Sequence, residues 1–241
     1  MAMKRIVLVT GDKGGTGKST FARGVLDCYL ARGIACQPYD ADRRNAQLYR
    51  HYKPAGVRRL DFFTRGGADA LLDDLEQHRP QTVLVDLPSQ SGEAFENYEA
   101  DIGLFAQARE LGYDTTVALV LSRVADSINA LRLTLDYCGD AVDYLAVKNL
   151  FFGEPDRFAR FDRSQTRERL HQQGGLEISL PDLFDEVYDA IDERNLTFEE
   201  AVRGEAFTRS NRSRIYNWRK RLAAELDKAG PLLGLEASGD G

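Results

Sequence analysis

The sequence predicts a single α/β domain with a mainly parallel, twisted sheet and helices on both faces. Three observations predict it. Short apolar strands alternate with helical patterns, a glycine-rich loop joins the first strand to the first helix, and several strands end in Asp or Asn. The chain has 241 residues, and no repeat or linker divides it. Residues 1–241 are therefore expected to form one domain, with a loose tail from about residue 231.

The expected elements alternate from the start of the chain. A strand over 6–9 precedes the glycine-rich loop, and a helix over 18–32 has apolar residues at helical spacing and ends at Gly33. The other expected strands cover 34–39, 82–85, 116–121, 142–147 and 176–180. The other expected helices cover 68–78, 93–111, 126–137, 183–194, 198–203 and 210–229. Such alternation is typical of strand–helix–strand units, whose strands are parallel.

Composition and charge exclude several classes of protein. Hydrophobic residues make up 43% and charged residues 29%, which is ordinary for a globular domain. The net charge of -6 means that any nucleic-acid contact must come from a local basic patch. Cys28, Cys36 and Cys138 form no C-x-x-C pair, which argues against zinc and suits a reducing compartment. No run of 18 apolar residues exists, so we expect a cytoplasmic protein.

The loop over residues 11–20, GDKGGTGKST, has the pattern of a phosphate-binding loop, although Asp12 stands where the first glycine of the motif belongs. Glycines let backbone N–H groups converge on phosphate oxygens, and the following helix directs its N-terminus at the anion. Lys18 is expected to contact the β- and γ-phosphates, Ser19 to bind Mg²⁺ and Thr20 to reach the α-phosphate. The expected nucleotide-binding residues of the loop are Gly14, Gly15, Thr16, Gly17, Lys18, Ser19 and Thr20.

A second lysine, Lys13, gives the loop the form K-G-G-x-G-K-S. This form resembles the ParA/MinD superfamily of P-loop ATPases with a deviant Walker A motif, which belongs to the SIMIBI class. The resemblance implies that the nucleotide is ATP, that ATP holds two monomers face to face, and that Lys13 reaches the partner's nucleotide as a catalytic residue beside Lys18. The alternative is that Lys13 only balances the charge of the phosphates.

Residues 40–45, DADRRN, follow the second expected strand, where the family has its first switch. The family pattern is often D-x-D-P-Q-x-N. Here Arg43-Arg44 replaces Pro-Gln and Asn45 comes one residue early, as in plasmid transfer-region relatives of ParA. The resemblance implies that Asp42 positions the attacking water as a catalytic residue and that Asp40 supports the magnesium shell. Alternatively, these are ordinary turn residues at a strand end.

Residues 83–88, VLVDLP, form a hydrophobic strand that ends in Asp86. A carboxylate at this position beside a phosphate loop can hold Mg²⁺ through water. Asp86-Leu87-Pro88 also matches the D-x-P of the family's second switch, and Ser89 follows it.

Two positions are candidates for the base pocket. Asn149 ends a strand where the ParA/MinD group has an asparagine that reads the adenine edge, although a turn residue is the alternative. The step Leu180-Pro181-Asp182 resembles the family's later I-P loop, which implies that Pro181 covers the base.

The last expected helix is basic and also amphipathic. Its apolar residues Ile215, Trp218, Leu222 and Leu226 are spaced to lie on one face. One interpretation is a helix that packs on the sheet with solvated arginines, and a second is a patch that binds DNA phosphates. A membrane anchor is the third, although the extreme tail lacks basic and bulky residues. The basic residues concerned are Arg209, Arg212, Arg214, Arg219, Lys220 and Arg221.

These observations lead to an expected function and two rivals. The expected function is an ATPase that needs ATP and Mg²⁺, forms a homodimer with ATP and hydrolyses it slowly until a partner protein stimulates it. Such a cycle would partition or position plasmid DNA or a large complex. The first rival is a metabolic ligase or amidase of the dethiobiotin-synthetase-like branch. The second is a nucleotide-gated interaction protein with little hydrolysis, which the altered switch over 42–45 makes conceivable.

Overall fold

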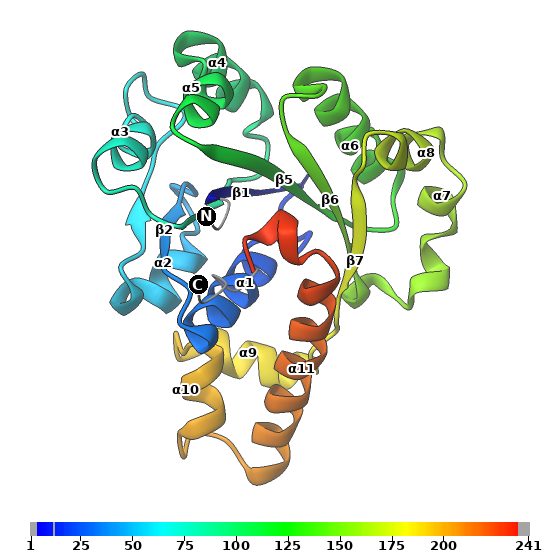
Figure 1. Ribbon diagram of the computed structural model, residues 1–241. Helices are drawn as coiled ribbons and strands as arrows, with labels where there is room; N and C mark the ends of the chain where they lie inside the picture. Colours follow the sequence, from blue (N-terminus) through cyan, green and yellow to red (C-terminus); the bar gives the residue numbers. More distant parts are fainter. Residues whose placement is uncertain (1–3, 12, 236–241) are drawn as a thin grey trace, which may run out of the picture.

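The computed structural model describes residues 4–11 and 13–235. Its strands are β1 (Lys4–Thr10), β2 (Cys36–Asp40), β3 (Arg58–Arg59), β4 (Thr82–Asp86), β5 (Tyr113–Leu121), β6 (Asp143–Asn149) and β7 (Leu176–Leu180). They form one sheet in the order β3-β2-β4-β1-β5-β6-β7, in which each neighbouring pair is parallel (Figure 1). The predicted fold class is confirmed.

Helices cover both faces of the sheet (Figure 1). Two apolar cores result, one on each face. Val7 and Val9 of β1 point into one core, and Ile6 and Leu8 point into the other, because side chains alternate along a strand. The first core is covered by α1 (Lys18–Arg32), α2 (Gln47–Tyr52), α9 (Asp185–Glu193), α10 (Phe198–Arg203) and α11 (Arg209–Lys228). The second is covered by α3 (Ala70–Gln77), α4 (Gly92–Ile102), α5 (Leu104–Glu110), α6 (Ala125–Cys138), α7 (Ala159–Asp162) and α8 (Gln165–Gln172).

The prediction of a single helix over 93–111 is wrong, because this segment forms two helices, α4 and α5. Gly103 separates α4 from α5 and has a φ of 65°. This left-handed conformation suits glycine and ends a helix, so the chain changes direction there. The sequence pattern also missed the short elements α2, β3, α7 and α8, which have too few residues to show a clear period.

The predicted loose tail is wrong for residues 231–235. The short helix η4 (Gly230–Leu233) follows α11, and the side chains of Leu233 and Leu235 are buried in the first core. The hydroxyl of Tyr29 also donates a hydrogen bond of 2.5 Å to the carbonyl oxygen of Leu233. The predicted looseness of 236–241 lies outside the described residues. Across the described part of the chain, no helix is both long and apolar enough to cross a membrane.

Candidate nucleotide site

The candidate site lies at the carboxyl ends of β1, β2 and β4. In the sheet register Val9 of β1 is paired with Asp86 of β4, and Asp86 is paired with Asp40 of β2. The phosphate loop leaves β1 at this same edge and leads into α1 at Lys18. Parallel strands thus place the loop and both strand-end carboxylates together, as the βα order of the sequence predicted.

A cleft of about 640 Å³ opens at this edge and contains most of the predicted site residues. The predicted residues that line it are Gly14, Gly15, Gly17, Lys18, Ser19, Thr20, Asp42, Asn149 and Pro181. Thr16, Lys13, Asp40 and Asp86 do not line the cleft. Asp40 and Asp86 lie beneath it, with 0% and 1% of their surface exposed, and Thr16 is also buried.

Gly17 shows why the loop needs glycine just before α1. Its φ is 94°, and a Cβ placed there would lie 2.3 Å from the side-chain nitrogen of Asn149. A side chain at this position would therefore be strained and would push β6 away from the loop.

Lys18 is held inside the loop, with 6% of its surface exposed. Its Nζ donates to the carbonyl oxygen of Lys13 at 3.0 Å and to the hydroxyl of Ser89 at 2.8 Å. The ammonium therefore joins the two ends of the phosphate loop to the segment that follows β4. Ser89 lines the cleft as well, so the second-switch segment contacts the same lysine that is predicted to bind phosphates.

Asp86 is a buried carboxyl group close to Ser19 and Lys18. Neither of its oxygens has a hydrogen bond of ordinary geometry with the described residues. Burial, and after it nearby Asp40, raise its pKa to about 8, although the hydroxyl of Ser19 and the ammonium of Lys18 act in the opposite direction. A buried carboxyl beside a hydroxyl is an arrangement that can hold a divalent cation. The residues present therefore fit the predicted Mg²⁺ site.

Asp40 and Asp42 shape the first-switch segment through its backbone. Asp40 accepts from the backbone N–H groups of Asp42 and Tyr49, each at 2.9 Å, and burial raises its pKa against these two hydrogen bonds. Asp42 accepts from the N–H groups of Arg44 at 2.8 Å and Asn45 at 2.9 Å. Both carboxylates thus fold the turn between β2 and α2. This favours a structural part for Asp40 over direct magnesium contact, whereas Asp42 also faces the cleft.

Asn149 is close to the phosphate loop, and both the nitrogen and the oxygen of its side-chain amide already form hydrogen bonds. The nitrogen donates to the carbonyl oxygen of Thr16 at 2.8 Å, and the oxygen accepts from the N–H of Phe151 at 3.1 Å. Asn149 therefore ties β6 to the loop. Reading of the adenine edge stays a prediction, and it would have to use the second N–H of the amide or a rearranged side chain.

The far end of the cleft contains residues that the sequence did not indicate. Asp185, Tyr188 and Asp189 belong to α9, Leu183 precedes that helix, and Phe151 follows β6 with 59% of its surface exposed. No motif marks these positions, because only the fold brings α9 to the loop. Pro181 is fixed there, since the indole N–H of Trp218 donates to its carbonyl oxygen at 2.7 Å.

Thr20 is connected to a buried arginine through Tyr188. The hydroxyl groups of Thr20 and Tyr188 are 2.7 Å apart, and Arg23 lies 3.4 Å from the Tyr188 oxygen. Arg23 is fully buried, and its guanidinium stacks on the rings of Tyr188 and Phe198. The predicted contact of Thr20 with the α-phosphate would have to compete with this tyrosine.

Lys13 forms an ion pair within its own chain. Its Nζ contacts a carboxylate oxygen of Asp126 at the start of α6, and the side chains are 58% and 55% exposed. The predicted action of Lys13 on a partner's nucleotide would therefore require this exposed pair to separate.

The basic helix α11 serves packing first. Ile215, Trp218, Leu222 and Leu226 are buried in the first core, as the amphipathic pattern predicted. Arg219 does not belong to a surface patch, because its side chain is only 17% exposed and pairs with Asp27 at 2.7 Å and with Glu199. Its inclusion among the DNA-contact residues is therefore corrected.

The remaining basic residues of α11 stay at or near the surface. Arg214 stacks on Phe184 and donates to Asn211 at 2.7 Å, while Arg212 donates to the carbonyl oxygen of Gly204 at 3.1 Å. Arg209, Lys220 and Arg221 are exposed.

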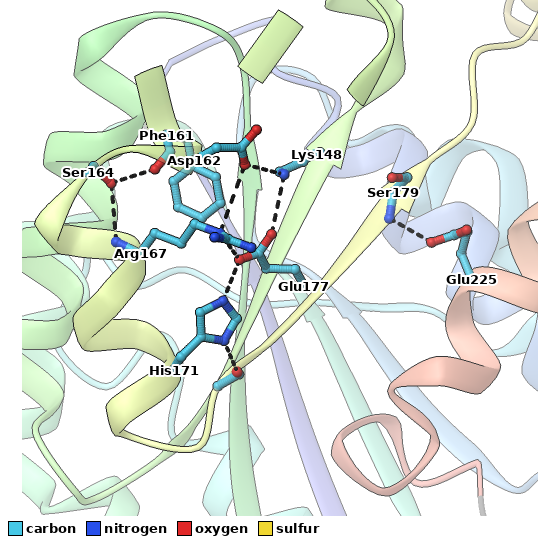
Figure 2. Close-up of polar contacts among 10 residues, drawn as sticks. Lys148, Phe161, Asp162, Ser164, Arg167, His171, Glu177, Ser179 and Glu225 are labelled. Atoms are coloured by element: carbon cyan, nitrogen blue, oxygen red, sulfur yellow. Dashed lines mark hydrogen bonds and ion pairs between the residues drawn. The ribbon is translucent and has the colours of Figure 1, made fainter. Parts of the chain in front are cut away.

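A polar network beside Asn149 joins β6 to β7 (Figure 2). Lys148 of β6 contacts Asp162 at 2.5 Å and Glu177 of β7 at 3.2 Å. Glu177 also accepts from Arg167 at 2.5 Å and lies 2.6 Å from the Nε2 of His171. Negative and positive groups alternate here and satisfy one another, so we interpret the network as support for the strand ends that carry Asn149 and Leu180.

Replacing Glu177 by Gln should reduce the free energy of unfolding by about 1–3 kcal/mol at neutral pH, because Lys148 and Arg167 lose a charged acceptor. Burial raises the pKa of Glu177, but Arg167 and Lys148 lower it by more, so it ends below the ordinary value of 4.5. The carboxylate therefore stabilises the fold above that value, and the stabilisation is lost as the pH falls through the lowered pKa.

Urea unfolding at about pH 7 and about pH 3.5 checks this expectation. The difference between the wild type and Glu177→Gln should shrink at the lower pH. Glu168→Gln on the exposed side of α8 is the matched control and should change little. An equal effect of both substitutions would contradict the assigned role of the network.

The chain is similar in sequence to two known proteins over nearly its whole length. The chain is 25% identical to "Protein MobD" of Acidithiobacillus ferrooxidans over 225 residues, covering 93% of this chain and 97% of MobD. It is 24% identical to "Protein TraL" of Escherichia coli over 244 residues, covering 95% of this chain and all of TraL. No family model matches the chain.

The fold is that of a known group of solved structures. The septum site-determining protein MinD of Pyrococcus horikoshii, solved with Mg-ADP, superposes with a TM-score of 0.53 at 17% identity, covering 96% of this chain and 99% of MinD. Its fold agrees with the one that the phosphate loop and the order of elements predicted. The chain thus has the P-loop NTPase fold of MinD and is similar in sequence to MobD and TraL over nearly its whole length.

Proposed function

We propose that this protein is an ATPase that dimerises face to face with ATP and Mg²⁺ and hydrolyses ATP slowly until a partner protein stimulates it. Its cycle would partition or position plasmid DNA or a large complex, in plasmid maintenance or conjugation. The observation that carries the proposal is the cleft over the phosphate loop, with Lys18 held inside the loop and the buried Asp86 beneath it. Similarity to MobD and TraL over nearly the whole chain supports it further.

Each part of the site has a chemical task in this proposal. The backbone N–H groups of residues 14–19 and the N-terminus of α1 bind the phosphates. Lys18 exchanges its contacts with Ser89 and the Lys13 carbonyl for phosphate oxygens, which frees the second-switch segment. Ser19 and Asp86 would hold Mg²⁺, which when bound neutralises charge on the β- and γ-phosphates. Asp42 faces the cleft from the first switch and would orient the attacking water.

The contacts of the first-switch segment would explain slow ATP hydrolysis in the absence of a partner. Asp42 uses one carboxylate oxygen to fold its own turn through the N–H groups of Arg44 and Asn45. Arg59 additionally donates to the Asp42 carbonyl oxygen at 2.7 Å, and Arg43 pairs with Asp61 at 3.5 Å. These contacts hold the segment in one conformation, and a partner that shifts it would reposition Asp42.

The test is binding to non-specific duplex DNA with ATP, with ADP and without nucleotide, at about 50 mM and about 200 mM salt. Binding that requires ATP and weakens with salt is expected. DNA binding that is the same with and without nucleotide, or no binding in any state, would contradict the DNA part of the proposal. The protein would then have to act on a protein surface instead of DNA. ATP turnover measured in the same samples tests the enzymatic part separately.

The double substitution Arg209→Gln/Arg214→Gln should weaken this DNA binding and reduce the salt slope by about 2, because each lost phosphate contact removes about one unit of slope. The two arginines lie on the exposed side of α11. Arg160→Gln/Arg163→Gln near α7 removes the same charge from another exposed surface and is the control. If the two double substitutions changed DNA affinity and its salt slope equally, α11 would have only a packing role.

A further inference from the structure

A second hollow lies beyond the second switch, on the opposite face of the sheet from α1. It has a volume of about 950 Å³ and runs between the loop over 62–66 and the helix α4; we name it the α4 groove. Phe62 and Tyr98 form its buried apolar floor, with ring centroids 5.1 Å apart. Phe63 lines the groove with 50% of its surface exposed. The groove thus offers an apolar anchor site open to solvent.

The rim of the α4 groove is acidic. Asp69, Glu93 and Asp101 line it, against one cation, Arg65. The guanidinium of Arg65 is 3.5 Å from Asp101, but its side chain is 89% exposed and the pair is correspondingly weak. A basic guest could displace it. This charge repels nucleic-acid phosphates and anionic lipid headgroups, whereas it attracts a basic peptide.

Both switches are connected to the walls of the groove. One wall starts at Gln90, directly after the Ser89 that contacts Lys18, and Gln90 has a φ of 59°, which is unusual for a residue other than glycine. The loop of the other wall is folded by Asp61, which accepts from the Phe63 N–H at 3.0 Å and from the Thr64 hydroxyl at 2.6 Å. The same Asp61 pairs with Arg43 of the first switch.

We infer that the α4 groove is the docking site for a basic segment of a partner protein that inserts an apolar side chain beside Phe63 and places lysine or arginine against Glu93 and Asp101. Its occupant would push on Gln90 from one wall and on Asp61 from the other, and so would change the position of both switches. This inference rests on the proposed function, because it supplies the chemistry of the stimulating partner. It adds a place and a recognition rule that the nucleotide site does not contain.

The experiment uses a phage-displayed library of random 12-residue peptides, selected on the full chain with ATP and Mg²⁺. Selection on the variant Glu93→Lys/Asp101→Lys removes peptides that bind elsewhere. The enriched peptides should combine lysine or arginine with bulky apolar residues. A selection that yields acidic peptides, or none that distinguishes the variant from the wild type, would overturn the inference.

A synthetic, fluorescein-labelled version of the most enriched peptide then gives affinities by anisotropy. Glu93→Lys/Asp101→Lys and, separately, Phe63→Ala should each weaken its binding at least tenfold. The control Asp73→Lys/Glu76→Lys reverses two exposed charges on α3 outside the groove and should stay within twofold of the wild type. Equal affinities for the groove variants and the control would also overturn the inference.

Nucleotide affinity and basal ATP turnover are measured for every variant without peptide. Wild-type levels in the groove variants show that the fold and the nucleotide site are intact. Failure of the wild type to bind or hydrolyse ATP would defeat the proposed function. Failure of peptide recognition beside normal nucleotide binding would defeat only the docking inference.

Discussion

Replacing Lys18 by Ala should weaken binding of ATP about 100-fold or more. The ammonium is buried in the loop, and its charge-assisted hydrogen bonds to phosphate oxygens contribute several kcal/mol in such a site. The substitution removes the one loop side chain that is predicted to contact the transferred phosphate. Fluorescence titration with a labelled nucleotide, or calorimetry, measures the affinity.

Two controls separate binding from folding in this experiment. Lys220→Ala removes an exposed lysine on α11 and should leave the affinity for ATP unchanged. Because Lys18 also joins Ser89 to the loop, thermal unfolding should be recorded for Lys18→Ala, and a shift of a few degrees is compatible with an intact fold. Micromolar affinity retained by a folded Lys18→Ala would contradict the assignment of the phosphate loop.

The sequence was sufficient for the parts of the fold that follow a local rule. The strands that lead to Thr10 and Asp86 are short buried runs, and α1 and β7 have the bounds that the pattern gave. Gly103 was visible in the sequence, but a glycine within an apolar period does not by itself reveal a change of direction. The helix was therefore expected to continue to 111.

Contacts between distant segments account for what the sequence could not supply. Asn149 was placed near the nucleotide by resemblance, but its bonds to Thr16 and Phe151 depend on how closely β6 packs against the loop. Tyr188 reaches Thr20 across more than 160 residues of chain, and no spacing rule covers that distance. Arg219 looked like a surface cation because the buried Asp27 that pairs with it lies on α1.

Charge patterns show the same limit in another way. Arg209, Arg212 and Arg214 form a dense basic run, yet Arg212 and Arg214 make local contacts with Gly204, Asn211 and Phe184. The acidic rim of the α4 groove gave no signal at all, since Asp69, Glu93 and Asp101 are scattered among ordinary helical residues. Composition predicts how much charge a chain carries, and only the fold decides which charges converge.

Lys13→Ala should leave the affinity for ATP within a few-fold of the wild type and abolish ATP-dependent dimerisation. In the proposed dimer Lys13 contacts the partner's nucleotide, so its removal leaves the charge of two nucleotides uncompensated across the interface. Sedimentation velocity or light scattering after size exclusion, with ATP and with ADP, measures the association. A Lys13→Ala protein that dimerises with ATP as the wild type does would exclude the action in trans.

The ion pair between Lys13 and Asp126 leads to a second prediction, in which a substitution strengthens dimerisation. Lys13 must leave Asp126 before it can contact another molecule, and an exposed pair contributes about 0–1 kcal/mol. Asp126→Asn should therefore strengthen ATP-dependent dimerisation about twofold to fivefold, and it should not restore the dimerisation that Lys13→Ala loses, because the aspartate acts only by holding the lysine. If Asp126→Asn restores association with ATP to the Lys13→Ala protein, the aspartate affects the interface directly, and the pair does not hold back the lysine.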